Sequence, residues 1–249
     1  MAAEDRGENK IELKNIAYAW QDVHRFSPAP RHRRRIILGI LKKIEFNSCL
    51  DTGCAQPYLL EAISKRNIQV FGCDISDRVI QAKKKNFPAA QFEDVDISKE
   101  VYPQGKKFDL VISSEVIEHI KDWQQAIKNL TKMSDRYLLI TVPSGKVHNI
   151  DKIIGHFRHY NYEDLKNEIE NNSFHIIFYK SWGIPFHTVY KYLINTFGYK
   201  KIYKKFAYKK YGIIEKIISS FLYFLFYFND MFNSGLQLFI LAEKNNFTK

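Results

Sequence analysis

The stretch that decides the fold reads Cys49-Leu50-Asp51-Thr52-Gly53-Cys54-Ala55-Gln56-Pro57, and Val70-Phe71-Gly72-Cys73-Asp74 follows it a short way along the chain. The first stretch predicts a buried strand, a tight turn of small residues and the start of a helix. The second predicts another buried strand that ends on an acid. In an open α/β sheet such a turn lets the backbone approach a ligand, and an acid at the next strand tip accepts ribose hydroxyls. The two stretches therefore predict a site for a nucleoside-type cofactor.

Apolar runs alternate with helical patterns along the rest of the chain. Strands are predicted around 47–51, 68–74, 91–93, 108–113, 137–142, 174–180 and 236–243. Helices are predicted over 33–44, 57–66, from Ser76 or Asp77 to Asn86, from Asp122 to Met133, and over 162–171. Strands that alternate with helices indicate an α/β fold with a doubly wound, mostly parallel, Rossmann-like sheet of seven strands.

The length of 249 residues fits one domain with a cap. We expect a single domain made of an N-terminal helical arm over 1–35, a cofactor-binding core over 36–182, a helical lid over 183–234 and a last strand over 235–249. Within the core, residues 144–160 are expected to form a loop.

The net charge of +11 is spread unevenly. One cluster comprises Arg31 and Arg33 to Arg35, a second extends from Lys191 to Lys210, and no Asp or Glu occurs between Glu170 and Glu215. The positive electrostatic potential of these clusters favours an anionic partner, which would be a phosphate-bearing substrate, an acidic membrane surface or nucleic acid. The alternative is that the clusters form a solvated basic face without a partner.

The three cysteines lie within or beside the two cofactor strands, and their number is odd. No metal-ligand spacing joins them, so they are interpreted as reduced core residues of a cytosolic protein. The start of the chain is polar and charged, which predicts no signal peptide. We therefore expect a cytoplasmic protein, with peripheral membrane contact as an additional expectation.

Two further blocks complete the pattern: Phe108-Asp109-Leu110-Val111-Ile112-Ser113-Ser114-Glu115-Val116-Ile117-Glu118-His119, and His156-Phe157-Arg158-His159-Tyr160-Asn161-Tyr162-Glu163-Asp164-Leu165. With the four blocks in this order, the chain resembles the class I S-adenosylmethionine-dependent methyltransferases, most closely the ubiquinone-biosynthesis-like and sugar O-methyltransferases. The resemblance covers about residues 35–180 and the last strand. A dinucleotide dehydrogenase is disfavoured because the glycine that lets a pyrophosphate approach the backbone is missing.

The resemblance implies S-adenosylmethionine as cofactor and assigns residues to it by position. Asp51 and the backbone of Gly53, Cys54 and Ala55 would hold the methionine end, and Ser113 would help with its amino group. Asp74, followed by Ile75, would accept both ribose hydroxyls, and Asp96, followed by Ile97, would lie by the adenine amino group, with Asp94 as the alternative. Ala55 and Pro57 replace glycines that the family usually has, so weak or lost cofactor binding stays an alternative.

The candidate catalytic residues are His119, Glu118 and His156. His119 follows the strand 108–113 at the sheet edge where ligands bind, and a neutral imidazole accepts a proton at neutral pH. A histidine that only shapes the site is the alternative. On a helix, Glu115, Glu118 and His119 would share one face and could converge on a divalent ion, with His156 or His159 as a further ligand.

Two segments outside the core bear on the acceptor. In the arm, His24, Arg25 and Arg31 lie among aromatic residues, which suits a phosphorylated or sugar acceptor, or simple packing of the arm. In the segment 199–232, lysine pairs lie among aromatic residues before an apolar run with helical spacing. This suits a lipid interface or a lid over a lipid-linked acceptor. A lid buried against its own domain or a dimer partner is the alternative.

The sequence therefore predicts an S-adenosylmethionine-dependent methyltransferase that O-methylates a small anionic, glycan or lipid-linked acceptor. An RNA methyltransferase is less favoured, because no RNA-binding module and no Asn-Pro-Pro-Tyr-type motif is visible. A non-catalytic binding protein on a decayed methyltransferase fold is the third hypothesis. The sequence does not predict the oligomeric state.

Overall fold

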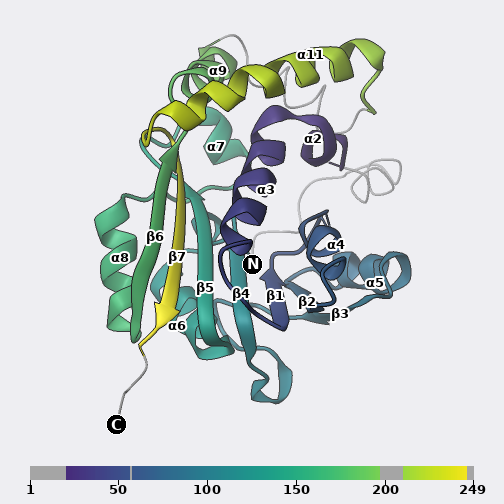
Figure 1. The fold of residues 1–249 in the computed structure, drawn as a ribbon, viewed down its shortest axis with the longest axis vertical. Helices are drawn as coiled ribbons and strands as arrows, with labels where there is room; N and C mark the ends of the chain where they lie inside the picture. The colour runs from purple at the N-terminus through teal and green to yellow at the C-terminus, as the bar shows by residue number, and fades with distance from the viewer. Residues whose placement is uncertain (1–20, 57, 197–209, 246–249) are drawn as a thin grey trace, which may run out of the picture.

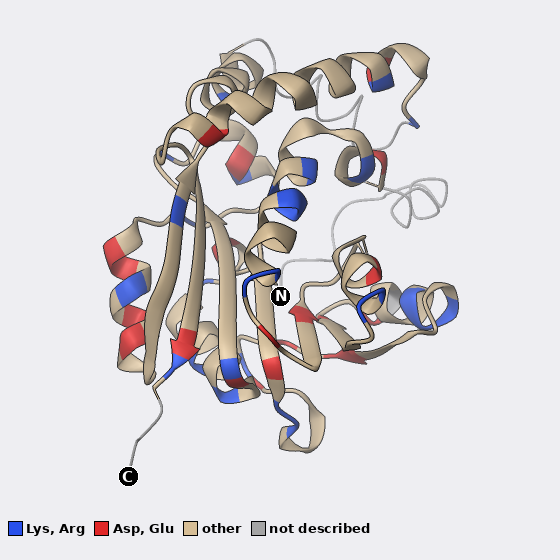
Figure 2. Ribbon diagram, viewed as in Figure 1, with Lys and Arg blue, Asp and Glu red and all other residues tan. Residues whose placement is uncertain are grey.

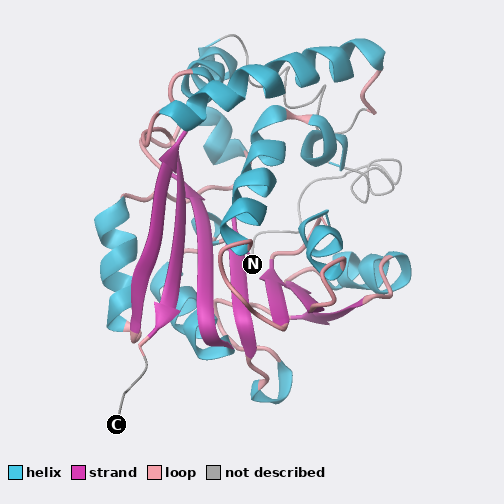
Figure 3. Cartoon of the chain, in the orientation of Figure 1, coloured by secondary structure: helices cyan, strands magenta, loops and turns pink. Residues whose placement is uncertain are grey.

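A computed structural model describes residues 21–56, 58–196 and 210–245, and these form a sheet of seven strands flanked by helices (Figures 1 and 3). The strand order is β3-β2-β1-β4-β5-β7-β6. β7 runs antiparallel to both of its neighbours, and the other strand pairs are parallel. The predicted α/β class with a doubly wound, mostly parallel sheet is confirmed.

The strands are β1 Ser48–Thr52, β2 Gln69–Asp74, β3 Ala90–Asp94, β4 Phe108–Ser114, β5 Ser134–Pro143, β6 Phe174–Trp182 and β7 Gln237–Lys244. The α-helices are α2 Gln21–Phe26, α3 Pro28–Leu41, α4 Tyr58–Ser64, α5 Asp77–Asn86, α6 Trp123–Met133, α7 Asn149–Ile153, α8 Tyr162–Asn171, α9 Phe186–Thr196 and α11 Ile213–Leu225. Short 3-10 turns are η1 Pro103–Gly105, η2 Ile117–His119 and η3 Phe226–Met231.

Successive strand residues point to opposite faces of the sheet, and each face carries its own core. Leu50 lies in a cluster with residues of α6 and α8. Its neighbour Cys49 lies in a second cluster, on the side of α3 and α4. Because both faces are covered, the central strands are apolar throughout, as in other buried parallel sheets.

Local capping explains several of the helix starts. The Ser76 hydroxyl accepts a hydrogen bond from the Val79 N–H at 3.4 Å, and the Asp122 carboxylate accepts one from the Gln125 N–H at 3.1 Å. The helix predicted over 33–44 begins earlier, at Pro28, because proline fits the first helical turn at no loss of a hydrogen bond.

The segment 144–160 is not wholly a loop as predicted, because it contains the five-residue helix α7. The Asp151 carboxylate caps its start by accepting a hydrogen bond from the His148 N–H at 2.8 Å. A helix this short has no hydrophobic periodicity to reveal it.

The helical insertion before the last strand is present. β6 and β7 form an antiparallel pair, and α9, α11 and η3 lie between them in sequence. α11 packs against α2 and α3, and Figure 1 places all three at the same end of the molecule as α7 and α9. Within the described residues, no helix combines the length and apolarity that a membrane span requires.

Candidate functional site

A cavity of about 560 Å³ opens beyond the carboxyl ends of the central strands. Asp51 and Gly53 line it from the end of β1, and Ser114 and Glu115 line it from the end of β4. The strand order reverses between these two strands, and ligands of open α/β sheets bind at such a switch point. Residues of α2, α3, α4, α7 and α9 contribute to the remaining walls, so the arm, the core and the insertion all border the cavity.

The turn after β1 depends on Gly53, whose φ of +69° favours glycine. A Cβ at this position would lie 2.5 Å from Val116 Cγ2. The N–H groups of Gly53 and Cys54 both donate to the Cys73 carbonyl, at 2.7 and 3.1 Å. These two donors therefore brace the turn, and the role of this backbone in holding the methionine end stays a prediction. Gly53 and Ala55 line the cavity, whereas Cys54 is buried.

Asp51 is a buried carboxyl group that reaches the cavity. Burial raises its pKa to about 8, and the nearby charge of Asp74 adds to the shift. No ion pair joins it to a cation among the described residues. A buried acid of this kind fits the ammonium group of a ligand, which would stabilise its ionised form.

The acid that ends β2 lies beside the cavity rather than in its wall. The Asp74 Oδ1 atom accepts a hydrogen bond from the Ser76 N–H at 3.0 Å, which orients the carboxylate. The next side chain, Ile75, is 68% exposed although it is apolar. An oriented carboxylate followed by an exposed apolar side chain fits a ribose and the face of an aromatic base. Pro57, which the sequence analysis singled out after the turn at Gly53, lies outside the described residues.

Besides Cys54, Asp74 and Ile75, three further residues expected at the cofactor do not line the cavity. The Asp96 carboxylate is bound by its own loop, accepting from the Ser98 hydroxyl at 2.6 Å and pairing with Lys99 at 2.7 Å. Ile97 is a core residue, and Ser113 is fully buried. Strand alternation explains the last result, since it turns Ser114 rather than Ser113 toward the cavity.

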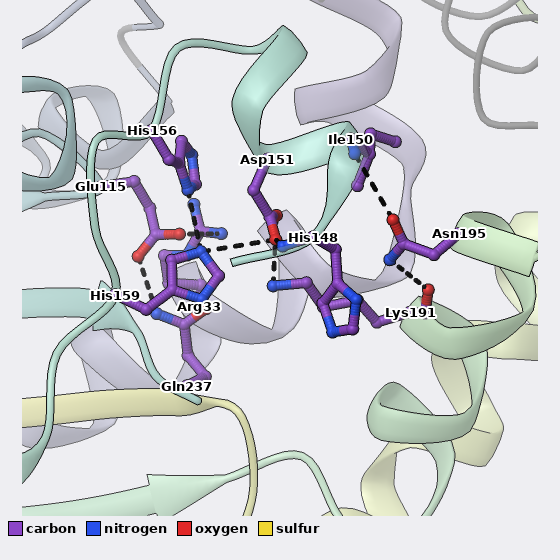
Figure 4. Close-up of polar contacts among 10 residues, drawn as sticks. All are labelled: Arg33, Glu115, His148, Ile150, Asp151, His156, His159, Lys191, Asn195 and Gln237. Carbon is purple, nitrogen blue, oxygen red and sulfur yellow. Dashed lines mark hydrogen bonds and ion pairs between the residues drawn. The ribbon is translucent and has the colours of Figure 1, made fainter. Parts of the chain in front are cut away.

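Two of the predicted catalytic residues, His119 and His156, line the cavity together. Their rings are perpendicular, with centroids 4.7 Å apart. Behind them, His156 Nδ1 lies 3.1 Å from His159 Nε2, and His159 Nε2 lies 3.5 Å from Asp151 Oδ2 (Figure 4). Lys191 Nζ of α9 holds the other Asp151 oxygen at 3.3 Å. The result is a chain of imidazoles anchored on a carboxylate.

Burial keeps these imidazoles neutral at pH 7. It lowers the pKa of His156 to about 3 and that of His159 to about 4. It also lowers the pKa of His119, against the effect of a hydrogen bond with the Gly155 backbone. Each ring therefore keeps a nitrogen lone pair that can accept a proton.

The third predicted catalytic residue, Glu118, lies behind the cavity wall. Its side chain is fully buried, and neither carboxylate oxygen has a hydrogen-bond partner among the described residues. Burial raises its pKa well above the usual range, and the charge of Glu115 raises it further. Burial therefore favours the protonated form of Glu118, and a cation beside it would favour the ionised form.

The metal-ligand trio predicted from Glu115, Glu118 and His119 is not formed as expected. Residues 117–119 form a 3-10 turn, and Glu115 has a φ of +60°, so the helical spacing does not hold. The ligand atoms that do lie within 4.8 Å of one another are those of Glu118, His119 and His156. A second group of this kind consists of Asp151, His156 and His159.

Glu115 instead joins three distant parts of the chain. Its Oε2 atom pairs with Arg33 of α3 at 3.0 Å, and its Oε1 atom accepts from the Gln237 amide of β7 at 2.7 Å (Figure 4). Gln237 is a site residue that the sequence reasoning missed. The signal available was a lone amide in the otherwise apolar run 236–242.

The cavity rim is basic. Arg33, Arg34 and Lys191 line it, together with His24 and His187. Arg33 and Lys191 are paired with carboxylates, whereas the Arg34 guanidinium lies over the Tyr58 ring at 5.4 Å. Burial lowers the pKa of His24 to about 4. Of the arm residues named from the sequence, His24 lines the cavity, whereas Arg25 and Arg31 do not.

Comparison with known proteins agrees with this geometry. The family model described as "Methyltransferase domain" matches residues 14–177, which is more than half of the chain. The chain therefore belongs to this family, and the resemblance to the class I S-adenosylmethionine-dependent methyltransferases is confirmed.

Among curated relatives, the ubiquinone biosynthesis O-methyltransferase of Coxiella burnetii is 31% identical over 86 residues, which is 32% of this chain and 36% of that protein. The enzyme of the same name from Pelagibacter ubique is 28% identical over 146 residues, covering 50% of this chain and 60% of that protein. Among solved structures, the N-methyltransferase NodS from Bradyrhizobium japonicum, in complex with S-adenosylhomocysteine, has a TM-score of 0.56 at 14% identity and covers 88% of this chain and 89% of that one. This last likeness concerns the fold alone.

Proposed function

We propose that the protein transfers a methyl group from S-adenosylmethionine to a hydroxyl oxygen of a small acceptor that has an apolar body and an anionic head. Membership in the methyltransferase-domain family supports the reaction class. The matched relatives named ubiquinone biosynthesis O-methyltransferase support oxygen as the methylated atom. The alignments span about a third to three fifths of those relatives, so the acceptor is argued from the cavity itself.

The residues at the switch point fit the cofactor. Asp51 would hold its ammonium group, since it is a buried acid that lacks a cation. Asp74 would accept the two ribose hydroxyls, and the exposed Ile75 would pack on the adenine. Gly53, which has no side chain, lines the cavity beside Asp51. When bound, S-adenosylmethionine supplies a methyl group on a sulfonium, a good leaving group for in-line displacement.

The chain's own residues would align the acceptor and remove its proton. His119 lies at the cavity with a lowered pKa, so its imidazole is neutral and accepts the hydroxyl proton. His156, held against His159 and Asp151, orients His119 edge-on. The perpendicular pair of His119 and His156 in the cavity wall is the observation that carries the proposal.

The residues that line the cavity support this class of acceptor. Arg34 is a cation in the rim with no ion-pair partner among the described residues, and it would bind an anionic group. Apolar side chains of Ile37, Leu59 and Ile153 line the same cavity and would pack on a hydrophobic body. A catechol or phenol with a carboxylate and a prenyl tail satisfies both requirements.

The test is methyl transfer from labelled S-adenosylmethionine to prenylated dihydroxybenzoates, with the product identified by mass spectrometry. We expect a methyl ether, and His119→Gln is expected to lower kcat by about 100-fold or more while cofactor affinity stays unchanged. His175→Gln is the matched control, because His175 lies on β6 and contacts Asn245.

Two results would overturn the proposal. One is cofactor binding by the wild-type protein without transfer to any hydroxyl acceptor, or with transfer only to amines or RNA. The other is full activity of the His119→Gln variant.

A further inference from the structure

The helix α11 presents an apolar face to solvent. Its members, between 53% and 78% exposed, are Ile213, Ile214, Ile217, Ile218, Phe221 and Phe224. Their spacing places them along one side of the helix. On the opposite side, Ser219 is buried, and the ring of Tyr223 is tilted against the ring of His32 of α3, with centroids 4.2 Å apart. The helix is therefore fixed to the molecule by one side, and its more apolar side is left outward.

Neighbouring elements extend this surface. After α11 the chain exposes Phe228, Met231 and Phe232, and α9 exposes Val189 and Tyr192. Figure 2 shows α11 almost free of charged residues apart from one end. Large apolar side chains clustered in this way on a folded protein mark a surface that meets a partner or a membrane. We name the α11 residues listed above together with Phe228, Met231 and Phe232 the apolar lid surface.

Positive charge beside the apolar lid surface favours an anionic membrane as its partner. Lys210 and Lys216, at the start of α11, are both exposed. The sequence between α9 and α11 adds the pairs Lys200-Lys201 and Lys204-Lys205, and no Asp or Glu lies between Glu170 and Glu215. A basic segment joined to an apolar helix face matches a bilayer with anionic headgroups. A second copy of the chain would instead bring two basic segments together, which costs free energy.

The same surface is coupled to the cavity. His32 Nε2 lies 2.7 Å from the Tyr223 carbonyl of α11, and the Arg31 guanidinium lies 3.7 Å from the centroid of the Tyr223 ring. Both residues belong to α3, which also carries Arg33, Arg34 and Ile37 of the cavity wall. A bilayer bound by α11 therefore lies next to the helix that covers the site.

We propose that the protein binds the surface of anionic membranes through the apolar lid surface, with α11 lying in the plane of the headgroups and its lysines on the phosphates. α11 has 13 residues, which is too short to span a bilayer but suited to lie along one. This proposal is independent of the acceptor, because membrane binding is measured without any methyl transfer.

The test is co-sedimentation of the full chain with vesicles of phosphatidylcholine and phosphatidylglycerol, compared with vesicles of phosphatidylcholine alone. We expect binding to the anionic vesicles that weakens as salt is raised. The variant Ile214→Gln/Ile217→Gln/Phe221→Gln should lose at least about tenfold in binding. Lys210→Gln/Lys216→Gln should lose about 30-fold. The matched charge control is Lys65→Gln/Lys132→Gln, two exposed lysines outside the lid, which should bind like the wild type.

A second readout guards against a variant that fails to fold. Phe224→Trp places an indole on the apolar lid surface, and its emission should shift to the blue when anionic vesicles are added. Three results would overturn the proposal: no binding to either vesicle type, wild-type binding by the triple variant, or a dimer in solution that the triple variant converts to monomer. The last result would assign the surface to a second copy.

Discussion

Replacement of Asp74 by alanine tests how the cofactor is held. The carboxylate ends β2, and its Oδ1 atom is oriented by the Ser76 N–H at 3.0 Å. Two ribose hydroxyls would donate to it, and a hydrogen bond to a charged group contributes about 1.5 kcal/mol or more. Loss of both bonds is therefore expected to cost about 3 kcal/mol, which weakens S-adenosylhomocysteine binding about 150-fold.

Isothermal titration calorimetry at constant pH measures this change. Asp74→Asn keeps one good acceptor and should lose about tenfold. Asp135→Ala is the matched control for net charge, because Asp135 is an exposed acid at the start of β5, at the opposite edge of the sheet from Asp74. It should bind within about twofold of the wild type.

Thermal unfolding of each variant separates binding from folding, since Asp74 also braces the turn that precedes α5. The reasoning is refuted if Asp74→Ala, in its folded state, binds the cofactor with wild-type affinity. Equal losses in Asp74→Ala and Asp135→Ala would also refute it, because the effect would then come from net charge.

Three further predictions concern the turn and the buried acids. Gly53→Ala places a Cβ 2.5 Å from Val116 Cγ2 at a φ of +69°, so urea unfolding should show a loss of about 2–5 kcal/mol; unchanged stability would contradict the described turn. Because burial raises the pKa of Glu118, the folded state holds a proton that the unfolded state releases above its own pKa, so the contribution of Glu118 to stability falls from about pH 4 upward. Glu118→Gln should make the loss of stability with rising pH smaller than in the wild type, and a divalent cation that stabilised only the wild type would show a metal site instead. Asp51, with a pKa of about 8, should release about one proton when it meets the cofactor ammonium at pH 7, seen as a buffer-dependent binding enthalpy that Asp51→Asn abolishes.

Local sequence signals predicted the framework of the site well. Apolar runs gave the strands, and Ser76 and Asp122 marked helix starts that the structure confirms as capped. The turn at Gly53 was predicted from small residues after a buried strand, because strand-turn-helix geometry depends on neighbours in sequence.

Contacts between residues that are distant in sequence could not be predicted from such local signals. The arginine cluster was interpreted as a field for anions or a solvated face, yet Arg33 pairs with Glu115 and Arg35 pairs with Asp230 of the insertion. Arg31 stacks on Tyr223. Arg31 and Arg35 therefore fasten the arm to the lid, Arg33 fastens it to the end of β4, and nothing in their local spacing indicates these partners.

The residues around His119 show a second limit. Helical spacing predicted that Glu115 and Glu118 face the same way, but the chain forms a 3-10 turn with Glu115 at positive φ. Glu118 is turned into the protein and Glu115 toward Arg33. The choice between an α-helix and a short turn depends on packing between β4 and α6, which periodicity over five residues does not encode.

The most direct measurement is a crystal structure of the protein with S-adenosylhomocysteine. The account predicts the ribose on Asp74, the amino group on Asp51, and the sulfur facing the cavity wall that holds His119. A nucleoside bound away from the β1–β4 switch point, or crystals without the ligand at saturating concentration, would contradict it.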